Sequence, residues 1–333
     1  FRRVLFRSTI IEEGNELLTR LKKALVEGEE VALPQFTSCS PGWINFAEEF
    51  YPNFLPNISS CKSPQQMFGA LAKSYYADSL GIDRSKMTVV SVMPCTAKKY
   101  ECARPEMNDS GLQDVDYVLT TRELGQLIKS GGVDFHSLPD EEMDAPLGLS
   151  SGAADIFANT GGVMEAALRT VYEVVTGRKL PMENLHVTPL AGLQGVKEAE
   201  VTFTDTVQEW SFLEGVTARV AVAHGLGNTA ELMDRIQRGE ATYHFVEIMT
   251  CPGGCIGGGG QPRVTDNSVR QARIDAIYRE DEGKKIRTSH ENPAIQEIYN
   301  TFLGAPLGER SHHLLHTSYA PKQLDKDREG QMV

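Results

Sequence analysis

Four cysteines follow short apolar segments of the sequence, at the places where predicted strands end. They are Cys39, Cys95, Cys251 and Cys255. In open α/β sheets, bound groups gather at the carboxyl ends of the strands, so these cysteines could meet in one crevice. Four thiolates are the ligand set that a [4Fe–4S] cluster requires. A structural zinc site and unrelated buried cysteines are the alternative interpretations of the same residues.

The segment from Cys251 to Gly260 favours the cluster. Cys251 and Cys255 are four residues apart, so one helical turn would aim both sulfurs in the same direction. A run of glycines from Gly257 to Gly260 follows directly. Glycines let the backbone approach a bulky anion and offer N–H groups to its sulfides.

The composition is that of a globular protein. The 333 residues are 41% hydrophobic and carry a net charge of −12, and this length forms one large domain or two modest ones. The acidic balance argues against nucleic acid or an anionic membrane as a partner. No apolar run reaches the roughly 18 residues that a membrane span needs. Six cysteines are too few for a disulfide scaffold, and their spacing indicates metal ligation in a reducing compartment, which predicts a cytoplasmic location.

A predicted helix precedes the first cysteine. Thr9 to Glu12 has the form of a capping box, which predicts a helix from there to about Val26. Its expected buried stripe comprises Leu17, Leu18, Leu21 and Leu25. Charged residues occupy another face of this helix, namely Glu13, Glu16 and Arg20, and a solvated surface with charge pairing is their simplest interpretation.

The remaining elements alternate between strands and helices. The predicted strands span residues 31–36, 87–93, 116–120, 199–203, 219–223 and 243–249. The predicted helices span residues 63–76, 121–130, 163–175 and 229–238. This alternation indicates an α/β architecture with mostly parallel sheets. The charged residues after Tyr319 predict a frayed end.

Three segments resemble, in order, the three signature segments of [FeFe]-hydrogenases. They are Thr37–Trp43 (TSCSPGW), Met93–Glu101 (MPCTAKKYE) and Glu247–Pro262 (EIMTCPGGCIGGGGQP). Shorter segments that also resemble the family are residues 63–66, 120–124, 160–169 and 289–292. The resemblance extends from Thr9 to about Tyr319.

The family resemblance implies two α/β lobes with mostly parallel twisted sheets flanked by helices, and an active-site cluster between them. We expect one lobe to comprise residues 1–127, completed by 244–320, and the other to comprise 128–243. Residues 321–333 are expected to form a flexible tail.

The family resemblance also implies the cofactor and its ligands. The cofactor is a [4Fe–4S] cube joined through one cysteine to a two-iron centre that carries carbon monoxide, cyanide and a bridging dithiolate with a basic amine. Cys95, Cys251 and Cys255 match cube ligands, and Cys255 matches the one that bridges. Ser40 stands at a further cube-ligand position, where the family usually has the second of two adjacent cysteines.

Further residues match the surroundings of that cofactor. Lys98 matches a lysine that pairs with a cyanide. Met93 and Met249 match thioethers packed around the two-iron centre, with ordinary core filling as their alternative role. Gln65 and Glu101 are expected to contribute to the cofactor-binding site as well.

A proton relay is implied on the first helix. Cys39 matches the thiol that passes protons to the amine, and Ser59, Glu13 and Glu16, with Arg20 nearby, match the relay to solvent. A buried redox site needs such a relay because it must exchange protons without admitting bulk water.

The sequence departs from the family at two places. A serine alkoxide is a harder ligand than thiolate, so either Ser40 binds weakly, or Cys39 becomes the fourth ligand, or one iron stays open. Residues 1–8 do not resemble the family, which suggests a truncated domain behind a foreign leader.

The expected activity is reversible reduction of protons to H2. Electrons would come from a ferredoxin-type carrier, and dedicated maturation proteins would build the two-iron centre. The alternatives are a non-catalytic iron–sulfur protein of the same fold, similar to the cytosolic iron–sulfur assembly factors, and a sensory hydrogenase.

Overall fold

Two sheets organise the chain in a computed structural model, which describes residues 6–141, 144–145, 147–181, 188–189, 195–263 and 266–322. The larger sheet has the order β1-β7-β6-β5-β4, and the smaller one pairs β2 with β3. The strands are β1 (Gln35–Phe36), β2 (Val90–Met93), β3 (Tyr117–Thr120), β4 (Thr188–Pro189), β5 (Val196–Thr202), β6 (Thr217–His224) and β7 (Phe245–Met249). The β1–β7, β6–β7 and β2–β3 pairs are parallel, whereas β4–β5 and β5–β6 are antiparallel. The predicted mostly parallel α/β class is confirmed.

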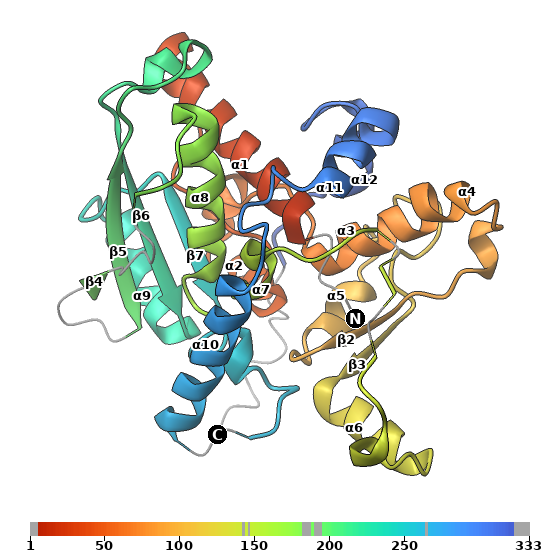
Figure 1. Cartoon of the computed structure of the whole chain (residues 1–333). Helices are drawn as coiled ribbons and strands as arrows, with labels where there is room; N and C mark the ends of the chain where they lie inside the picture. The colour runs from red at the N-terminus through yellow and green to blue at the C-terminus, as the bar shows by residue number, and fades with distance from the viewer. Residues whose placement is uncertain are drawn as a thin grey trace.

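Helices cover both faces of the larger sheet, because its strands alternate their side chains between two cores. On one face, Val220 and Val222 of β6 pack with α1 (Phe6–Lys22) and α8 (Gly162–Thr176). On the other face, Ala221 and Ala223 pack with α2 (Pro41–Phe50) and α9 (Leu226–Gln237). Figure 1 shows α1 and α8 side by side over this sheet, with β2 and β3 on the opposite side of the molecule.

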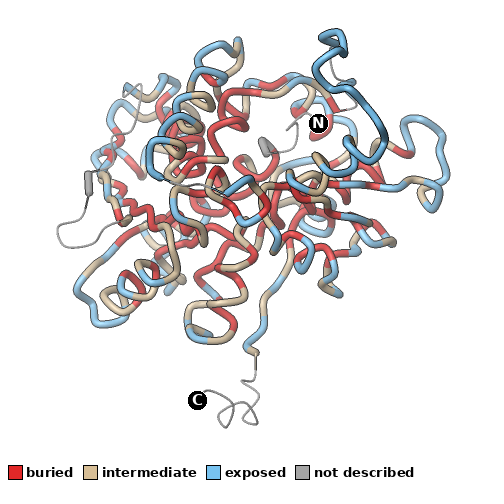
Figure 2. Tube along the Cα trace, turned by 90° about the horizontal axis from the view of Figure 1, so that it is seen from below, coloured by how far each residue is buried: buried red, intermediate tan, exposed pale blue. Residues whose placement is uncertain are grey.

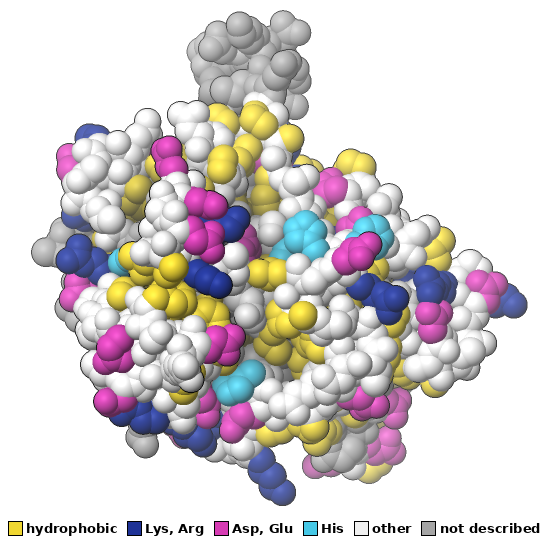
Figure 3. Space-filling view, turned by 90° about the horizontal axis from the view of Figure 1, so that it is seen from above, with side chains coloured by type: hydrophobic (Ala, Val, Ile, Leu, Met, Phe, Trp, Pro, Cys, Tyr) yellow, Lys and Arg dark blue, Asp and Glu magenta, His cyan; other side chains and the backbone are white. Residues whose placement is uncertain are grey.

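The other helices complete the fold around the smaller sheet and between the sheets. They are α3 (Pro64–Leu71), α4 (Ala77–Ser79), α5 (Lys98–Cys102), α6 (Thr121–Ser130), α7 (Gly152–Ile156), α10 (Asn267–Glu282), α11 (Pro293–Ile298) and α12 (Glu309–Leu315). Helix α10 packs on α7, and α12 packs on α3. Figure 2 shows the buried residues running through the centre, with exposed loops around them. On the face shown in Figure 3, acidic and basic side chains are interspersed.

The start of α1 differs from the prediction. The helix already includes Phe6, so Thr9 to Glu12 is not its capping box. The Thr9 hydroxyl instead donates to Met67 Sδ at 3.1 Å, and Glu12 is buried and binds groups from the C-terminal part of the chain. Both polar side chains of the predicted capping box therefore form tertiary contacts and do not cap the helix.

The predicted leucine stripe is wrong at its last position. Leu17, Leu18 and Leu21 are buried, but Leu25 is 53% exposed. A π-helical turn, Lys23–Glu27, follows α1. Each π turn holds one more residue than an α turn, so Leu25 rotates away from the core.

Other boundaries follow the sequence more closely. Pro64 begins α3 as predicted, and Thr120 with Glu123 forms a capping box at the start of α6. The apolar run 87–93 yields only a four-residue strand, β2, whose first residue Val90 is 44% exposed. A strand paired on one side only, in a two-stranded sheet, does not bury its whole length.

The larger sheet takes strands from both predicted lobes. β1 and β7 come from the first lobe, and β4 to β6 come from the second. The division into two lobes at residues 127 and 243 stays a prediction. The larger sheet joins strands that this division would assign to different lobes. The expected tail falls mainly on residues 323–333, which lie outside the described residues. Lys322, at its start, is held in place by Glu48, Asn45 and Tyr100.

Candidate active site

The four cysteines singled out by the sequence line one cavity of about 550 Å³. Cys39 follows β1, Cys95 follows β2, and Cys251 and Cys255 follow β7. Since β1 and β7 are parallel neighbours in one sheet and β2 belongs to the other, the cavity lies between the two sheets. The expectation that these strand ends share a crevice is confirmed. Other predicted site residues that line the cavity are Ser40, Gln65, Met93, Lys98 and Met249.

The Cys251–Cys255 segment is a glycine turn and not the expected helical turn. Gly253 and Gly254 both have positive φ, at 80° and 88°, a conformation that favours glycine. Two glycines of the following run, Gly258 and Gly260, lie against the loop that carries Cys95. A Cβ on Gly258 would be 2.2 Å from the Pro94 carbonyl oxygen, and one on Gly260 would be 3.0 Å from the Cys95 nitrogen. These glycines therefore bring the two cysteine-bearing loops together.

The donor atoms suit a cluster better than a single zinc ion. A tetrahedral zinc site holds its thiolates about 3.8 Å apart, given zinc–sulfur bonds of about 2.3 Å. Among the described residues, the one group of three such donors within 4.8 Å of one another is Glu16, Cys61 and His316, so no three of the cavity cysteines approach that closely. Sulfur donors spread around a cavity fit an iron–sulfur cluster, whose four ligands bind different irons.

Lys98 lies in the wall of this cavity and is only 9% exposed. Its ammonium donates to both carboxylate oxygens of Glu101, at 2.8 and 2.9 Å, and to the Cys39 carbonyl at 2.9 Å. Burial alone lowers the pKa of Lys98, but the charge and hydrogen bonds of Glu101 outweigh it, and the pKa is raised. The Lys98 amine is therefore protonated and fixed in position beside the cysteines.

Glu101 and Gln65 form the support of that cation. Glu101 also accepts from the Ser63 hydroxyl at 2.7 Å and from the Gln65 amide at 3.3 Å. Gln65 lines the cavity, whereas Glu101 is not among its lining residues. The geometry thus connects Glu101 to the cavity through Lys98.

Ser40 lines the cavity, but its hydroxyl is hydrogen-bonded to Thr250. Its Oγ lies 2.7 Å from the Thr250 hydroxyl and accepts from the Thr250 backbone N–H at 3.3 Å. Thr250, which directly precedes Cys251, carried no signal of its own in the sequence. The Ser40 oxygen is thus satisfied by the β7 loop.

The Cys39 thiol and the Glu13 carboxyl are both protonated near neutral pH. Burial, and next the charge of Glu13, raises the pKa of Cys39 well above its usual range. Burial, and next the charge of Glu16, raises the pKa of Glu13 to about 8, although the Ser38 backbone and the Ser59 hydroxyl lower it. Glu13 is 2% exposed, and its Oε1 has no hydrogen-bond partner within the described part of the chain.

A chain of hydrogen bonds continues from this carboxyl towards the surface. The Ser59 hydroxyl donates to Glu16 Oε2 at 2.6 Å, and Arg20 donates to Glu16 Oε1 at 2.7 Å. The side chain of Arg20 is 16% exposed and also reaches the Ala32 carbonyl at 2.8 Å. The charged face of α1 is therefore a buried polar path. The interpretation of Glu13, Glu16 and Arg20 as a solvated surface is wrong.

Several buried groups around this path were missed by the sequence analysis. Cys61 and His316 lie next to Glu16, and Glu247 is fully buried. Glu247 accepts from the N–H groups of Gly161 and Met164 at the start of α8, and burial raises its pKa to about 7. An isolated cysteine, histidine or glutamate gives no signal in one sequence, because only the fold brings them together.

Two family descriptions match the chain. Residues 5–259 match "iron only hydrogenase large subunit, C-terminal domain", and residues 267–322 match "iron hydrogenase small subunit". The first match begins upstream of Thr9, so the family sequence starts earlier than we expected and includes part of the supposed leader.

Individual relatives agree with these matches. The chain is 54% identical over 316 residues to the NADP-reducing hydrogenase subunit HndD of Solidesulfovibrio fructosivorans, covering 95% of this chain and 52% of that protein. It is 35% identical to cytosolic iron-sulfur assembly component 3 of Rattus norvegicus, covering 93% of this chain and 63% of that one. The chain thus spans about half to two thirds of the length of these relatives.

The fold is that of a solved hydrogenase. A variant of the [FeFe]-hydrogenase HydA1 from Chlamydomonas reinhardtii superposes with a TM-score of 0.85 at 46% identity, covering 96% of this chain and 83% of that one. None of the described helices is long and apolar enough to cross a membrane. The two family matches, the identity to HndD and this superposition agree, and the chain belongs to the iron-only hydrogenase family.

Proposed function

We propose that this chain is the cluster-binding domain of an [FeFe]-hydrogenase that reversibly reduces protons to H2. The observation that carries the proposal is a pairing of two features. One is the cavity lined by Cys95, Cys251 and Cys255. The other is a buried polar path that leads from Cys39, in the wall of the same cavity, through α1 to Arg20.

The residues present fit the cofactor of that family. Cys95, Cys251 and Cys255 would hold the iron–sulfur cofactor through their thiolates. Lys98 would place an ammonium beside the cyanide ligands, and Met93 and Met249 would exclude water from the same end of the cavity. When bound, the cofactor supplies the electron storage and the iron chemistry that join protons and electrons.

The polypeptide supplies the protons. The Cys39 thiol holds a proton at the cavity wall, because burial and the charge of Glu13 keep its pKa high. Glu13, with a pKa of about 8, can donate or accept near neutral pH, which suits a group that passes protons in both directions. Ser59 and Glu16 continue the path, and Arg20 orients the Glu16 carboxylate at its outer end.

Three alternatives exist for the ligand of the fourth iron of the cube. Ser40 could bind as an alkoxide, Cys39 could bind instead, or the iron could keep an exchangeable ligand. Ligation by Ser40 would leave its oxygen able only to accept from Thr250, because an alkoxide has no proton to donate.

A non-catalytic iron–sulfur protein is the second candidate, because the chain is also 35% identical to an assembly component. Such a protein would need the cube ligands but not the path through Glu13 and Glu16. The buried, ordered path therefore favours the enzyme.

Infrared spectroscopy tests the proposal directly. The chain is produced with and without hydrogenase maturation proteins, and carbon monoxide and cyanide stretching bands are sought together with H2 evolution from a reduced ferredoxin-type carrier. Bands and turnover that require maturation support the enzyme. A chain that takes up a cube but never shows the bands would support the assembly-type protein. A cytoplasmic location, and the carrier itself, stay predictions.

A further inference from the structure

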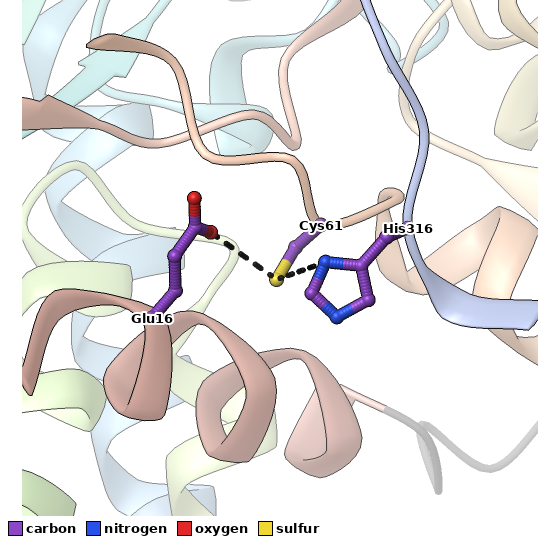
Figure 4. A group of neighbouring side chains, drawn as sticks. All are labelled: Glu16, Cys61 and His316. Atoms are coloured by element: carbon purple, nitrogen blue, oxygen red, sulfur yellow. Dashed lines mark hydrogen bonds between the residues drawn. The ribbon is translucent and has the colours of Figure 1, made fainter. Parts of the chain in front are cut away.

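Three potential metal ligands meet beside the polar path, from segments far apart in the sequence. Glu16 comes from α1, Cys61 from the segment before α3, and His316 from the residue after α12. Figure 4 shows the carboxylate and the imidazole pointing towards the same thiol. Cys61 Sγ lies 3.8 Å from Glu16 Oε2 and 4.0 Å from His316 Nδ1, and the three donor atoms lie within 4.8 Å of one another.

The imidazole is oriented for ligation by a second carboxylate. His316 Nε2 lies 3.1 Å from Glu12 Oε2, and Glu12 is held in turn by the Tyr299 hydroxyl and the Leu307 N–H. With the ring proton on Nε2, Nδ1 carries the lone pair, and it lies 2.8 Å from the Ser60 hydroxyl and 4.0 Å from Cys61 Sγ. A histidine that ligates a metal usually donates its other ring N–H to a carboxylate or carbonyl in this way.

We propose that Glu16, Cys61 and His316 bind a single divalent ion of the Zn²⁺ class, independently of the cluster cavity. Zinc bonds of about 2.3 Å to sulfur and about 2.0 Å to nitrogen or oxygen place tetrahedral ligands about 3.5 Å apart. The separations of 3.8 Å between Cys61 and Glu16 and 4.0 Å between Cys61 and His316 need to contract by about half an ångström or less, and the third pair lies within 4.8 Å.

The chemistry of the donors selects the class of ion. One thiolate, one imidazole and one carboxylate are borderline-soft ligands that suit Zn²⁺, whereas Mg²⁺ and Ca²⁺ prefer oxygen alone. Cys61 is fully buried, His316 is 4% exposed and Glu16 is 9% exposed, so an ion would enter past Ser60, which is partly exposed. Ligation releases the thiol proton of Cys61 to solvent and displaces the Ser60 hydroxyl from Nδ1.

Metal binding and the polar path compete for one oxygen. Glu16 Oε2 faces the Cys61 thiol and also accepts the hydrogen bond of Ser59 at 2.6 Å. An ion on this oxygen would take one of its acceptor sites and weaken the Ser59 bond, and with it the step between Glu13 and Glu16. The consequence that Zn²⁺ slows turnover rests on the proposed function, whereas the site itself does not.

The test uses the full chain with its iron–sulfur cluster reconstituted, so that iron occupies the cavity cysteines. Zn²⁺ is added by equilibrium dialysis, and zinc per chain is measured with the X-ray absorption spectrum at the zinc edge, to which iron does not contribute. We expect the chain to take up one zinc ion more than Cys61→Ala or His316→Ala, with one sulfur and the rest nitrogen or oxygen around it. Glu12→Gln should weaken binding about tenfold, because it changes only the support of the histidine.

Two controls separate this site from unspecific binding. Cys102→Ala removes a buried thiol away from the cluster, and His312→Ala removes the exposed imidazole that stacks on His316, and both should keep the zinc ion. Equal zinc in the wild type and in Cys61→Ala overturns the proposal. Where the matured chain evolves H2, the fraction of activity lost to Zn²⁺ should be smaller in Cys61→Ala. Bound zinc without inhibition would contradict the proposed relay while leaving the site intact.

Discussion

The Ser59 hydroxyl donates to Glu16 Oε2 at 2.6 Å, and it is also one of the groups that act on the Glu13 carboxyl. A hydroxyl has one proton to give, so Ser59 cannot donate to Glu13 while it donates to Glu16. Donation by Ser59 lowers the pKa of Glu13, and burial together with the charge of Glu16 outweighs that effect. The three side chains thus follow one another in the order Glu13, Ser59 and Glu16.

Ser59→Ala should break this order. We expect H2 evolution to fall by at least tenfold, while iron content and infrared bands stay as in the wild type, because the hydrogen bonds of the Ser59 hydroxyl in the described part of the chain involve Glu16 and the Cys61 N–H and not a cavity cysteine. Stability should fall by about 1–3 kcal/mol, since buried carboxyl oxygens lose a partner. Ser74→Ala is the matched control, since its buried hydroxyl only bonds the Ala70 carbonyl. Loss of iron in Ser59→Ala alone would show that Ser59 acts through the structure of the cavity.

Glu13 should leave a signature in the pH dependence of stability. Its pKa is about 8 in the fold and about 4.3 in the unfolded chain, so the fold binds the extra proton between these values. The free energy of unfolding therefore falls as pH rises from about 4.5 to 8. Glu13→Gln should make this decline shallower and should stabilise the chain at pH 8.

Urea unfolding at several pH values measures that difference, with the exposed Glu27→Gln as the control. Glu247, whose pKa is about 7, contributes a decline of the same sign in all variants. Parallel curves for Glu13→Gln and the wild type would mean that Glu13 is ionised in the fold.

Replacement of Lys98 should affect both the stability of the fold and the retention of the cofactor, and the two effects can be separated. Lys98→Met leaves the Glu101 carboxylate without its cation, and breaking a buried pair costs about 3–5 kcal/mol. The double variant Lys98→Met, Glu101→Gln removes the stranded charge and should recover much of the stability. We expect neither variant to retain cyanide and carbonyl bands after maturation. Bands that return in the double variant would mean that no cyanide needs the ammonium.

The sequence was most informative where residues adjacent in the chain act together. The cysteines of the three strand ends and Lys98 share one cavity, as their motifs predicted. The turn at Gly253 and Gly254 could not be deduced, because spacing of four is compatible with a helix or with positive φ at two glycines. His316 was invisible for a different reason, since its partners lie about 300 residues earlier in the chain. Only packing of α12 against α3 brings it to the path.

Ser40→Cys tests the fourth corner of the cube. The substitution replaces the hydroxyl that bonds Thr250 with a thiol at a position where the family resemblance expects a ligand. If the corner is now open or held weakly by Ser40, the variant should bind the cube more tightly, seen as higher iron per chain and a stronger electron-spin signal after anaerobic reconstitution. The loss of the Thr250 bond should cost only about 1 kcal/mol.

Cys39→Ala, reconstituted in parallel, distinguishes a role of Cys39 as the fourth ligand from a role in proton transfer. If Cys39 is the fourth ligand, this variant loses iron, and Ser40→Cys gains none. If Cys39 carries protons, Cys39→Ala keeps the cube and loses turnover, because its high-pKa thiol is the group that holds a proton at the cavity wall. A full iron complement in both Cys39→Ala and Ser40→Ala would exclude each of them as a required ligand. The three cysteines Cys95, Cys251 and Cys255 would then hold the cube with an exchangeable ligand on the fourth iron.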